Sequence, residues 1–393
     1  YVSEETNGWY KGGFLDKDHP DYTIQESSPH YKFYQSGGTI AADEMPYAET
    51  VFEPSPLNRI IKQGSTGNAW QPDANKNYSS TDKTIKMAYE TNTTGEVLLW
   101  SYTYPSEVLP FGLVDAGTTS NPKYYAPRTL YKNKTKDEHG HQIIEYVDKN
   151  GKIVLKRIQA VSGDVVMNNT NYASTYYIYD DYGNLVCVIP PEAVSRLGSE
   201  YYHSGATNAT KDTFLKRWAF RYTYDGRMRM SKKQVPGADP VLMVYDKRDR
   251  LVLTQDGNLK RSTTGTELRT WSFTKYDAMN RPVLTGIFAA DVVLSQEEMQ
   301  DRVNSYYENL GANGQWYEEY VGTIPGNVLG YTNKSYPPVS ATGSYLSAIY
   351  YDTYDFASAL YGDYSYTTDG LMHTINGVIY SHPSTAHGRV IGL

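Results

Sequence analysis

A short pattern recurs along the chain with constant internal spacing. It consists of an aromatic residue, Asp, two variable residues, a turn-forming residue, a basic or amide residue, any residue and then an apolar one. The clearest copies begin at Tyr179, Tyr245 and Tyr276, and degenerate copies begin at Val147 and Tyr224. Because the spacing is fixed within copies and variable between them, the pattern predicts β-hairpins joined by loops of unequal length.

Each copy contains residues that a tight turn requires. The Asp carboxylate can accept backbone N–H groups just downstream, and Gly, Asn or Asp four residues after the aromatic can adopt a left-handed conformation. In one degenerate copy Met228 stands at that position, and residues 52–59 form a looser echo of the pattern. The residues assigned to these turns are Asp148, Gly151, Tyr179, Asp180, Gly183, Tyr224, Asp225, Tyr245, Asp246, Asp249, Tyr276, Asp277 and Asn280.

Tyrosine dominates the aromatic content, with 39 Tyr and only 9 Phe among 393 residues. Tyr joins an apolar ring to a polar tip, so it fits the half-buried surface of a pleated sheet. This bias favours β-structure over a helical bundle. The net charge of −7 provides no basic surface for nucleic acid or anionic lipid. The single cysteine, Cys187, excludes an intrachain disulfide and is expected to be buried in an apolar strand.

Short helices are predicted in three segments, 192–197, 212–219 and 296–310. In the third segment Ser295 can act as the N-cap, with Glu298 completing a capping box. The side chains that helical spacing places on one side of this segment are Met299, Val303, Tyr306, Tyr307 and Leu310.

The expected fold class is mainly β, with successive antiparallel β-hairpins forming a curved strip or part of a spiral hollow shell, and a few short helical insertions. We divide the chain into an irregular β-rich N-terminal region packed on the repeats (1–130), the repeat hairpins (131–288), a helical insertion with a loop (289–334) and a truncated, Tyr-rich β continuation (335–393). The chain begins without Met or an apolar targeting segment, which favours a fragment of a longer protein. We expect no transmembrane segment and no cofactor.

The repeated pattern resembles the YD-repeat, or RHS-repeat, family. The stretches that carry the resemblance include YIYDDYGNLVCVIPPEAV (177–194) and VYDKRDRLVLTQDG (244–257), and they are similar to the N-terminal part of the repeat region in bacterial secreted or cell-surface members. This resemblance implies hairpins that spiral into a hollow shell around a C-terminal toxic or cargo domain. Many members end in a core segment that plugs the shell and cleaves itself with paired Asp residues. No such motif occurs in this chain, so that property could belong only to sequence beyond it.

Three groups of residues offer alternative chemistry. The repeat Asp residues could supply the paired carboxylates of a glycoside hydrolase, although turn formation already accounts for them. Asp16, Asp18 and Asp21 alternate in the manner of Ca²⁺ ligands, but they lack the Gly and the distal Glu of a complete loop. His139 and His141 lack a third zinc ligand nearby, so a surface turn is favoured for them.

We therefore expect a non-enzymatic structural segment of a larger extracellular or cell-surface protein, which encloses or presents a C-terminal cargo or toxin domain. Its main partner would be the remainder of its own chain, with secretion machinery or surface glycans as further candidates. A cell-surface adhesin or carbohydrate-binding module is the alternative hypothesis, and a glycoside hydrolase is the second alternative. Because an isolated hairpin is only marginally stable, neighbouring copies must bury one another's faces.

Overall fold

The structure is a computed structural model, and it describes residues 47–73, 78–117, 121–161, 167–203, 205–260, 269–311, 314–322, 329–339 and 344–352, together with Lys32, Asp43, Met45, Gly163 and the backbone of three short strands beyond residue 352. The chain divides into two compact units that are interleaved in the sequence. The first unit comprises residues 1–103, 114–178 and 188–210, and the second comprises residues 104–113, 179–187 and 211–393.

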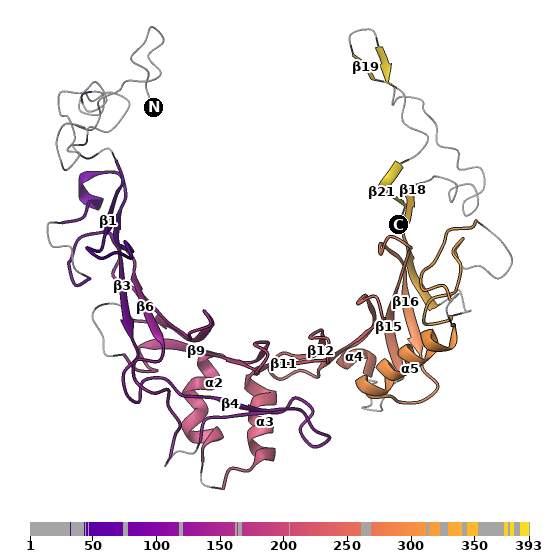
Figure 1. The fold of residues 1–393 in the computed structure, drawn as a ribbon, viewed down its shortest axis with the longest axis horizontal. Helices are drawn as coiled ribbons and strands as arrows, with labels where there is room; N and C mark the ends of the chain where they lie inside the picture. Colours follow the sequence, from indigo (N-terminus) through magenta and orange to yellow (C-terminus); the bar gives the residue numbers. More distant parts are fainter. Residues whose placement is uncertain are drawn as a thin grey trace. The chain divides into compact units, whose positions relative to one another are not determined.

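The first unit is built from antiparallel strands that follow one another in the order β1, β2, β3, β6, β7, β8 and β9 (Figure 1). Their bounds are β1 Glu49–Phe52, β2 Ile60–Gly64, β3 Ile85–Thr91, β6 Tyr131–Lys136, β7 Gln142–Val147, β8 Ile153–Gln159 and β9 Tyr172–Tyr179. Side chains along β9 alternate between buried and half-buried, because successive residues of a strand point to opposite faces. This alternation places Tyr172, Tyr176 and Ile178 in the core of the unit.

Short elements accompany these strands. The predicted helices at 192–197 and 212–219 are confirmed as α2 and α3, with bounds shifted by a few residues. The bounds of the short elements are η1 Asn68–Trp70, β4 Ser101–Thr103, β5 Leu113–Asp115, β10 Leu185–Ile189, α2 Pro191–Arg196, η2 Leu197–Tyr201 and α3 Asn208–Trp218. Both β10 and α3 contribute residues to the two units.

The second unit contains the antiparallel order β11, β12, β13, β14, β15, β16 and β17. The bounds of its strands and helices are β11 Phe220–Tyr224, β12 Met230–Gln234, β13 Val241–Tyr245, β14 Leu251–Gln255, α4 Gly257–Lys260, β15 Thr270–Tyr276, β16 Pro282–Ala289, α5 Gln296–Asn309, β17 Tyr345–Ala348, β18 Tyr350–Asp352, β19 His373–Ile375, β20 Val378–Tyr380 and β21 Ala386–Gly392. Strand β18 lies within the segment 335–393, for which a Tyr-rich β continuation was expected.

Pairing in the second unit is long within hairpins and short between them. Strand β15 pairs with β16 from Thr270 to Tyr276, whereas β14 pairs with β15 only at Leu253 and Thr254. The pairing between β12 and β13 is equally short. Neighbouring hairpins consequently separate toward their turns, where other groups must satisfy the backbone.

One face of this sheet is covered by α5 (Figure 1), whose buried side chains join the main core of the second unit. That core contains Trp271 and Phe273 of β15, with Met299, Val303 and Tyr307 from the helix. The mainly β fold of antiparallel strands with a few short helices is thus confirmed.

The helix predicted at 296–310 is confirmed, including its capping box. The hydroxyl of Ser295 accepts a hydrogen bond from the backbone N–H of Glu298, whose carboxylate accepts one from the N–H of Ser295. The prediction for Leu310 was wrong, because the helix ends at Asn309 and Leu310 is 36% exposed. Of the two predicted tyrosines, Tyr307 is buried and Tyr306 is only partly buried.

Candidate functional site

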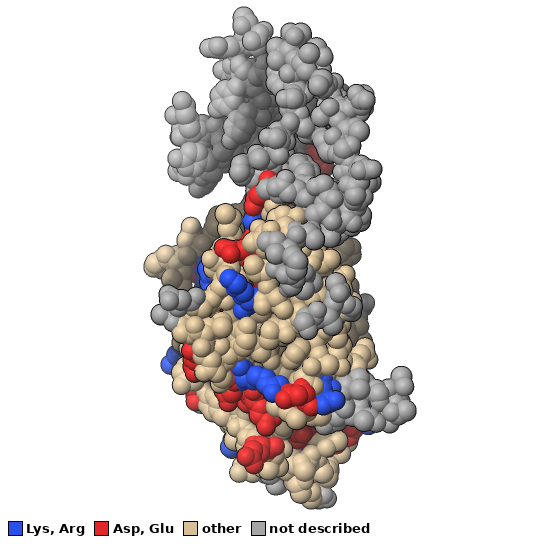
Figure 2. Space-filling view, turned by 90° about the vertical axis from the view of Figure 1, so that its right-hand side faces the viewer, with Lys and Arg blue, Asp and Glu red and all other residues tan. Residues whose placement is uncertain are grey.

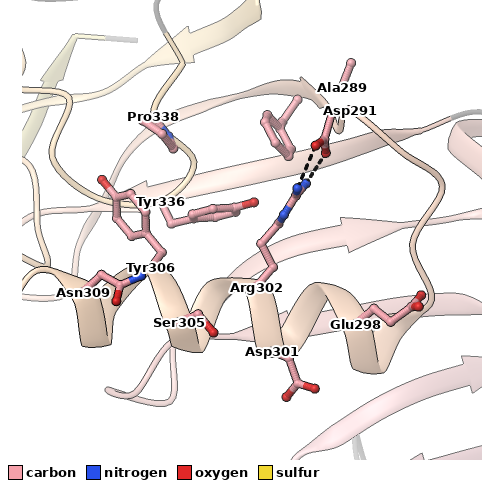
Figure 3. A pocket seen from close by; sticks show the side chains of 11 residues that line it. Ala289, Asp291, Glu298, Asp301, Arg302, Ser305, Tyr306, Asn309, Tyr336 and Pro338 are labelled. Carbon is pink, nitrogen blue, oxygen red and sulfur yellow. Dashed lines mark hydrogen bonds and ion pairs between the residues drawn. The ribbon is translucent and has the colours of Figure 1, made fainter.

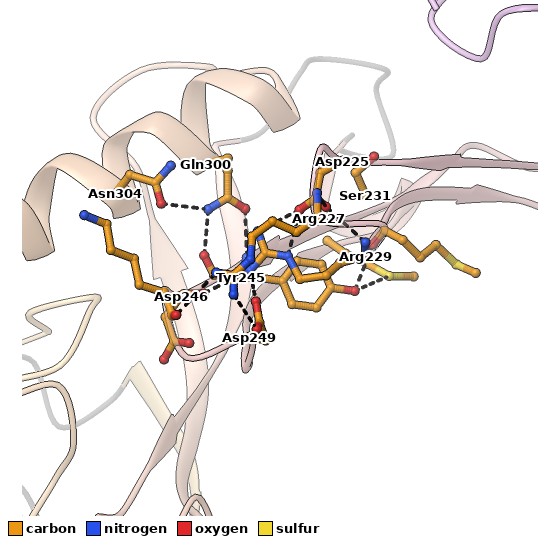
Figure 4. A network of polar contacts seen from close by, with 12 residues as sticks. Asp225, Arg227, Arg229, Ser231, Tyr245, Asp246, Asp249, Gln300 and Asn304 are labelled. Atoms are coloured by element: carbon orange, nitrogen blue, oxygen red, sulfur yellow. Dashed lines mark hydrogen bonds and ion pairs between the residues drawn. The ribbon is translucent and has the colours of Figure 1, made fainter. Parts of the chain in front are cut away.

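The turn at Asp246 shows how the recurring pattern folds (Figure 4). The backbone N–H of Asp246 donates to the carbonyl of Arg250, and the N–H of Asp249 donates back to the carbonyl of Asp246. Residues 247–249 therefore form a three-residue hairpin loop. Its last residue, Asp249, is left-handed with φ 63°, and a β-bulge lies beside the loop. The carboxylate of Asp246 accepts the N–H groups of Arg248 and Arg250, at 2.9 and 3.0 Å.

The same arrangement occurs at the other predicted positions. In each case Oδ1 of the Asp accepts the backbone N–H groups two and four residues downstream. The left-handed residues three positions after these Asp residues are Gly151, Gly183, Met228, Asp249 and Asn280. The Asp residues that hold these turns are Asp148, Asp180, Asp225, Asp246 and Asp277. Each carboxylate is therefore engaged within its own turn.

Sequence reasoning missed a further copy at Asp137. This carboxylate accepts the N–H groups of His139 and His141, and Gly140 has φ 91°. The pattern was missed because Lys136 stands where the aromatic residue is expected. The two histidines considered for zinc thus lie in this turn, on either side of Gly140, and His141 Nδ1 is 3.5 Å from the carboxylate of Asp137.

Arginine completes the turn in three copies of the second unit. The guanidinium of Arg229, four residues after Asp225, donates from Nε to Oδ2 of that Asp at 2.8 Å. Burial alone would raise the pKa of Asp225, but the hydrogen bonds from Arg229 and Arg227 outweigh it and lower the pKa. Arg250 pairs with Asp246 in the same way, and this carboxylate is completely buried.

The third arginine, Arg281, binds two carboxylates. Its Nε donates to Asp277 at 2.6 Å and its Nη2 donates to Asp352 at 2.7 Å. The hydrogen bond with Asp352, followed by that with Asp277, raises the pKa of Arg281 despite partial burial. The arginine therefore joins the hairpin of β15 and β16 to β18.

Successive copies are connected by a tyrosine. The hydroxyl of Tyr245 donates to the carbonyl of Met230 at 2.9 Å, and the guanidinium of Arg229 lies 4.7 Å from the centre of the Tyr245 ring (Figure 4). Arg229 also donates to the carbonyl of Asp246, the residue after that tyrosine. The arginine of one copy thus binds the aromatic residue and the turn of the next copy.

This connection recurs along the second unit and once in the first. Tyr276 contacts Leu251 and Arg250 in the same manner, and Tyr351 contacts Pro282 and Arg281. In the first unit, Arg59 of the looser copy at 52–59 lies over Tyr89, whose hydroxyl donates to the carbonyl of Ile60. The repeated pattern in the sequence contains a basic or amide residue beside the turn, but it does not identify the aromatic residue that this side chain contacts.

Where hairpins separate, side chains take the place of a neighbouring strand. The carboxamide of Gln300 on α5 accepts the N–H of Tyr245 at 2.9 Å and donates to its carbonyl at 2.6 Å (Figure 4). Gln296, one turn earlier, donates to the carbonyl of Met243. The helix therefore satisfies the backbone of β13 at the end where β12 no longer pairs with it.

A groove of about 710 Å³ lies beside the same helix. The rings of Tyr306 and Tyr336 stand edge to face in it, with centres 5.2 Å apart, and Phe288 packs against Tyr336. Arg302 extends from α5 to bind the carboxylate of Asp291 (Figure 3). Aromatic surfaces and charged groups are thus combined on the outside of the second unit.

The described residues do not place the predicted carboxylates in a common cleft. Among them, no group of three or more His, Cys, Asp or Glu side chains could hold a metal ion. Asp16, Asp18 and Asp21 lie outside the described residues. Cys187 is buried, and burial raises the pKa of its thiol to about 12, which disfavours the reactive thiolate.

On the face of the second unit that Figure 2 shows, Lys and Arg side chains lie beside Asp and Glu. This mixture differs from the basic surface that nucleic acids bind. In the part of the chain that the structure describes, no helix is both long enough and apolar enough to span a bilayer.

Comparisons with known proteins give one family match and several similar structures. A family model described as a domain of unknown function (DUF6443) matches residues 3–84. No curated protein matches the chain. The resemblance to YD-repeat proteins stays a prediction.

The similar solved structures are much larger chains. They include the crystal structures of TcdB2-TccC3 (14% identity, TM-score 0.30), TcdB2-TccC3-Cdc42 (13%, 0.30) and TcdB2-TccC3-TEV (12%, 0.29). Each match covers 62% of this chain and 10 or 11% of the other chain. The chain therefore spans about a tenth of the length of these proteins.

Proposed function

We propose that this chain is a structural wall segment of a larger secreted or cell-surface protein. In this proposal its hairpins enclose or present a cargo domain that another part of the same protein carries. The observation that carries the proposal is the connection between copies, in which Arg229 and Arg250 each bind the tyrosine of the following copy and Arg281 binds Tyr351 of β18. A wall needs such lateral cohesion, because a single hairpin is marginally stable.

The recurrence of the turn supports a structural role over a catalytic one. A glycoside hydrolase places two carboxylates on either side of one bond, with free oxygens directed at the substrate. Here the carboxylates of Asp246 and Asp277 accept backbone N–H groups and pair with arginine. We therefore propose a non-enzymatic protein without a cofactor, whose task is to exclude and package.

Limited proteolysis of the full-length protein tests this proposal. We expect the sequence that follows the chain to resist a protease when it is attached to the wall, and to be cut readily when it is produced alone. In the Asp246→Ala variant, which lacks a buried turn carboxylate, cleavage of that following sequence should increase at least tenfold. Tyr182→Ala is the matched control, since Tyr182 is 70% exposed at the tip of another turn. Equal cleavage of the attached and isolated segments would refute the packaging role.

The proposed extracellular or cell-surface location can be tested separately by cell fractionation and by protease treatment of intact cells. If the protein is secreted or displayed, it should be found in the medium or be digested by a protease added to intact cells. Recovery of the whole population in the cytosol of intact cells would contradict this part of the proposal.

A second candidate function, surface adhesion, is favoured by the groove beside α5. Tyr306 and Phe288, which are only partly buried, offer aromatic surface there, and sugars bind to such surface through their apolar faces. A glycan array with the full-length protein, repeated with Tyr306→Ala, would test this function. Binding that requires Tyr306 would favour adhesion, whereas the absence of any binding would count against it.

A further inference from the structure

A lysine, a glutamate and an asparagine meet in the interior of the second unit. The side chains of Lys275 on β15 and Glu318 are both 0% exposed. Nζ of Lys275 lies 3.0 Å from Oε1 of Glu318 and 2.7 Å from Oδ1 of Asn333. The carboxamide carbon of Asn333 is one covalent bond beyond that oxygen, so an amine and an acyl group are held side by side next to a carboxylate.

We propose that Lys275 and Asn333 become joined by an intramolecular amide bond, with Glu318 as the proton-transfer group. Lysine amines are nucleophiles when neutral, and asparagine carboxamides are acyl donors whose leaving group is ammonia. The fixed geometry replaces an encounter between two free groups, which raises their effective concentration by several orders of magnitude.

The step is balanced without an oxidant, a reductant or a further reactant. The ammonium of Lys275 first gives a proton to the carboxylate of Glu318. The free amine then attacks Cγ of Asn333, so that the Nζ–Cγ bond forms and the Cγ–Nδ2 bond breaks. Glu318 carries the proton from the attacking nitrogen to the departing one, and ammonia leaves.

The surroundings of the three residues favour this chemistry. Burial lowers the pKa of Lys275, although the negative charge of Glu318 opposes the shift, so the amine loses its proton more readily than an exposed lysine. Glu318 is held in place by the N–H and hydroxyl of Ser335, at 3.0 and 2.6 Å. Nδ2 of Asn333 donates to the carbonyl of Val339, which fixes the orientation of the carboxamide.

The first unit provides a natural comparison. Lys62 is also completely buried, but its Nζ contacts the carboxylates of Asp73 and Asp82 at 2.8 and 2.6 Å. Lys86 likewise pairs with Asp82. A carboxylate is a poor acyl donor because it has no neutral leaving group, so the contact of Lys86 with Asp82 should leave that lysine unmodified. Lys275, in contrast, has a carboxamide at hydrogen-bond distance.

Mass spectrometry of the intact chain tests the proposal. The folded protein should be lighter than its sequence by the mass of one ammonia molecule. Digestion with trypsin should yield a branched peptide in which Lys275 is bonded to Asn333, and cleavage after Lys275 should be lost. Peptides containing Lys86 should be cleaved normally.

Three variants separate this bond from other reactions. Asn333→Ala keeps the buried Lys275–Glu318 ion pair and should have the full sequence mass. Lys275→Arg should also have the full mass; if the ammonia loss persists in this variant, Asn333 has cyclised by itself and the proposal is wrong. Glu318→Gln should slow bond formation at least a hundredfold. Asn304→Ala, on α5, is the matched control and should lose ammonia as the parent does. A parent chain at full sequence mass after prolonged incubation would overturn the proposal.

Discussion

At the scale of single residues, the residue at the left-handed position of each turn determines how much backbone strain that turn contains. Gly and Asn adopt this conformation at little cost, whereas other L-residues bring Cβ close to the backbone carbonyl. The chain uses Gly151 and Gly183 in two copies and Asn280 in another. At Met228 it uses a long apolar side chain with φ 60°, which is 55% exposed and contributes little burial in return. This copy therefore contains local strain.

Replacing Met228 by Asn should stabilise the protein by about 1 kcal/mol, because Asn tolerates the left-handed conformation. Urea unfolding measures the change, which should appear as a higher midpoint with an unaltered slope. The reciprocal substitution Asn280→Met is the control and should destabilise by a similar amount. Equal midpoints for both variants and the parent would show that the turn conformation is not under strain.

The turn carboxylates should differ strongly in their contribution to stability. Asp246→Ala removes the partner of the buried Arg250 and should cost about 3–5 kcal/mol, because an uncompensated charge remains inside. Asp148→Ala removes the same two backbone hydrogen bonds from a turn without an arginine, and should cost only about 1–2 kcal/mol. Urea unfolding of the two variants measures these costs. Similar losses of unfolding free energy in Asp246→Ala and Asp148→Ala would contradict the role given to burial.

At the scale of elements, interactions within a few residues could be predicted from the sequence and interactions across many residues could not. The capping box of α5 depends on residues three apart, and each turn depends on residues four apart. Gln300 takes the place of a strand partner for Tyr245, although the two residues are 55 positions apart. No local sequence pattern predicts this contact. The copy at Asp137 was missed for a different reason, since its aromatic residue is replaced while its turn is intact.

Gln300→Ala should loosen the end of β13 selectively. The N–H and carbonyl of Tyr245 would lose their partner, which should cost about 1–3 kcal/mol. Hydrogen exchange measured residue by residue should show faster exchange of the Tyr245 amide, with little change in β15. Ser305→Ala, an exposed position on the same helix, serves as the control. Unchanged exchange at Tyr245 would mean that water replaces the carboxamide without loss.

At the scale of the whole molecule, the sequence indicated a hairpin-built β protein but not the interleaving of its two units. Residues 104–113 belong with 211–393 rather than with their neighbours in the chain. Such a division depends on contacts between remote segments, which residue periodicity does not record. Both units nevertheless share one electrostatic property, since each contains carboxylates whose pKa is lowered by hydrogen bonds, such as Glu96 in the first and Asp225 in the second.

The stability of the protein should consequently fall in acid. Burial would raise the pKa of Glu96, but hydrogen bonds from Lys132 and Tyr146 outweigh it and lower the pKa from 4.5 to about 2. A lowered pKa means that the stabilisation is present above pH 4.5 and is lost as the pH falls toward 2. Glu96→Gln should therefore destabilise the protein at pH 7 and have a much smaller effect near pH 2. If the difference in unfolding free energy between the parent and Glu96→Gln stayed constant across this pH range, the stabilising role of the ionised Glu96 would be contradicted.

The contact between one copy and the next has a direction. Where an arginine connects two copies, the earlier copy supplies the guanidinium and the later one supplies the ring and hydroxyl, as Arg229 and Tyr245 do. A chain leaving the ribosome exposes the earlier partner first, so each hairpin can dock onto a finished surface when it emerges. From this asymmetry we expect assembly by accretion from the N-terminal side.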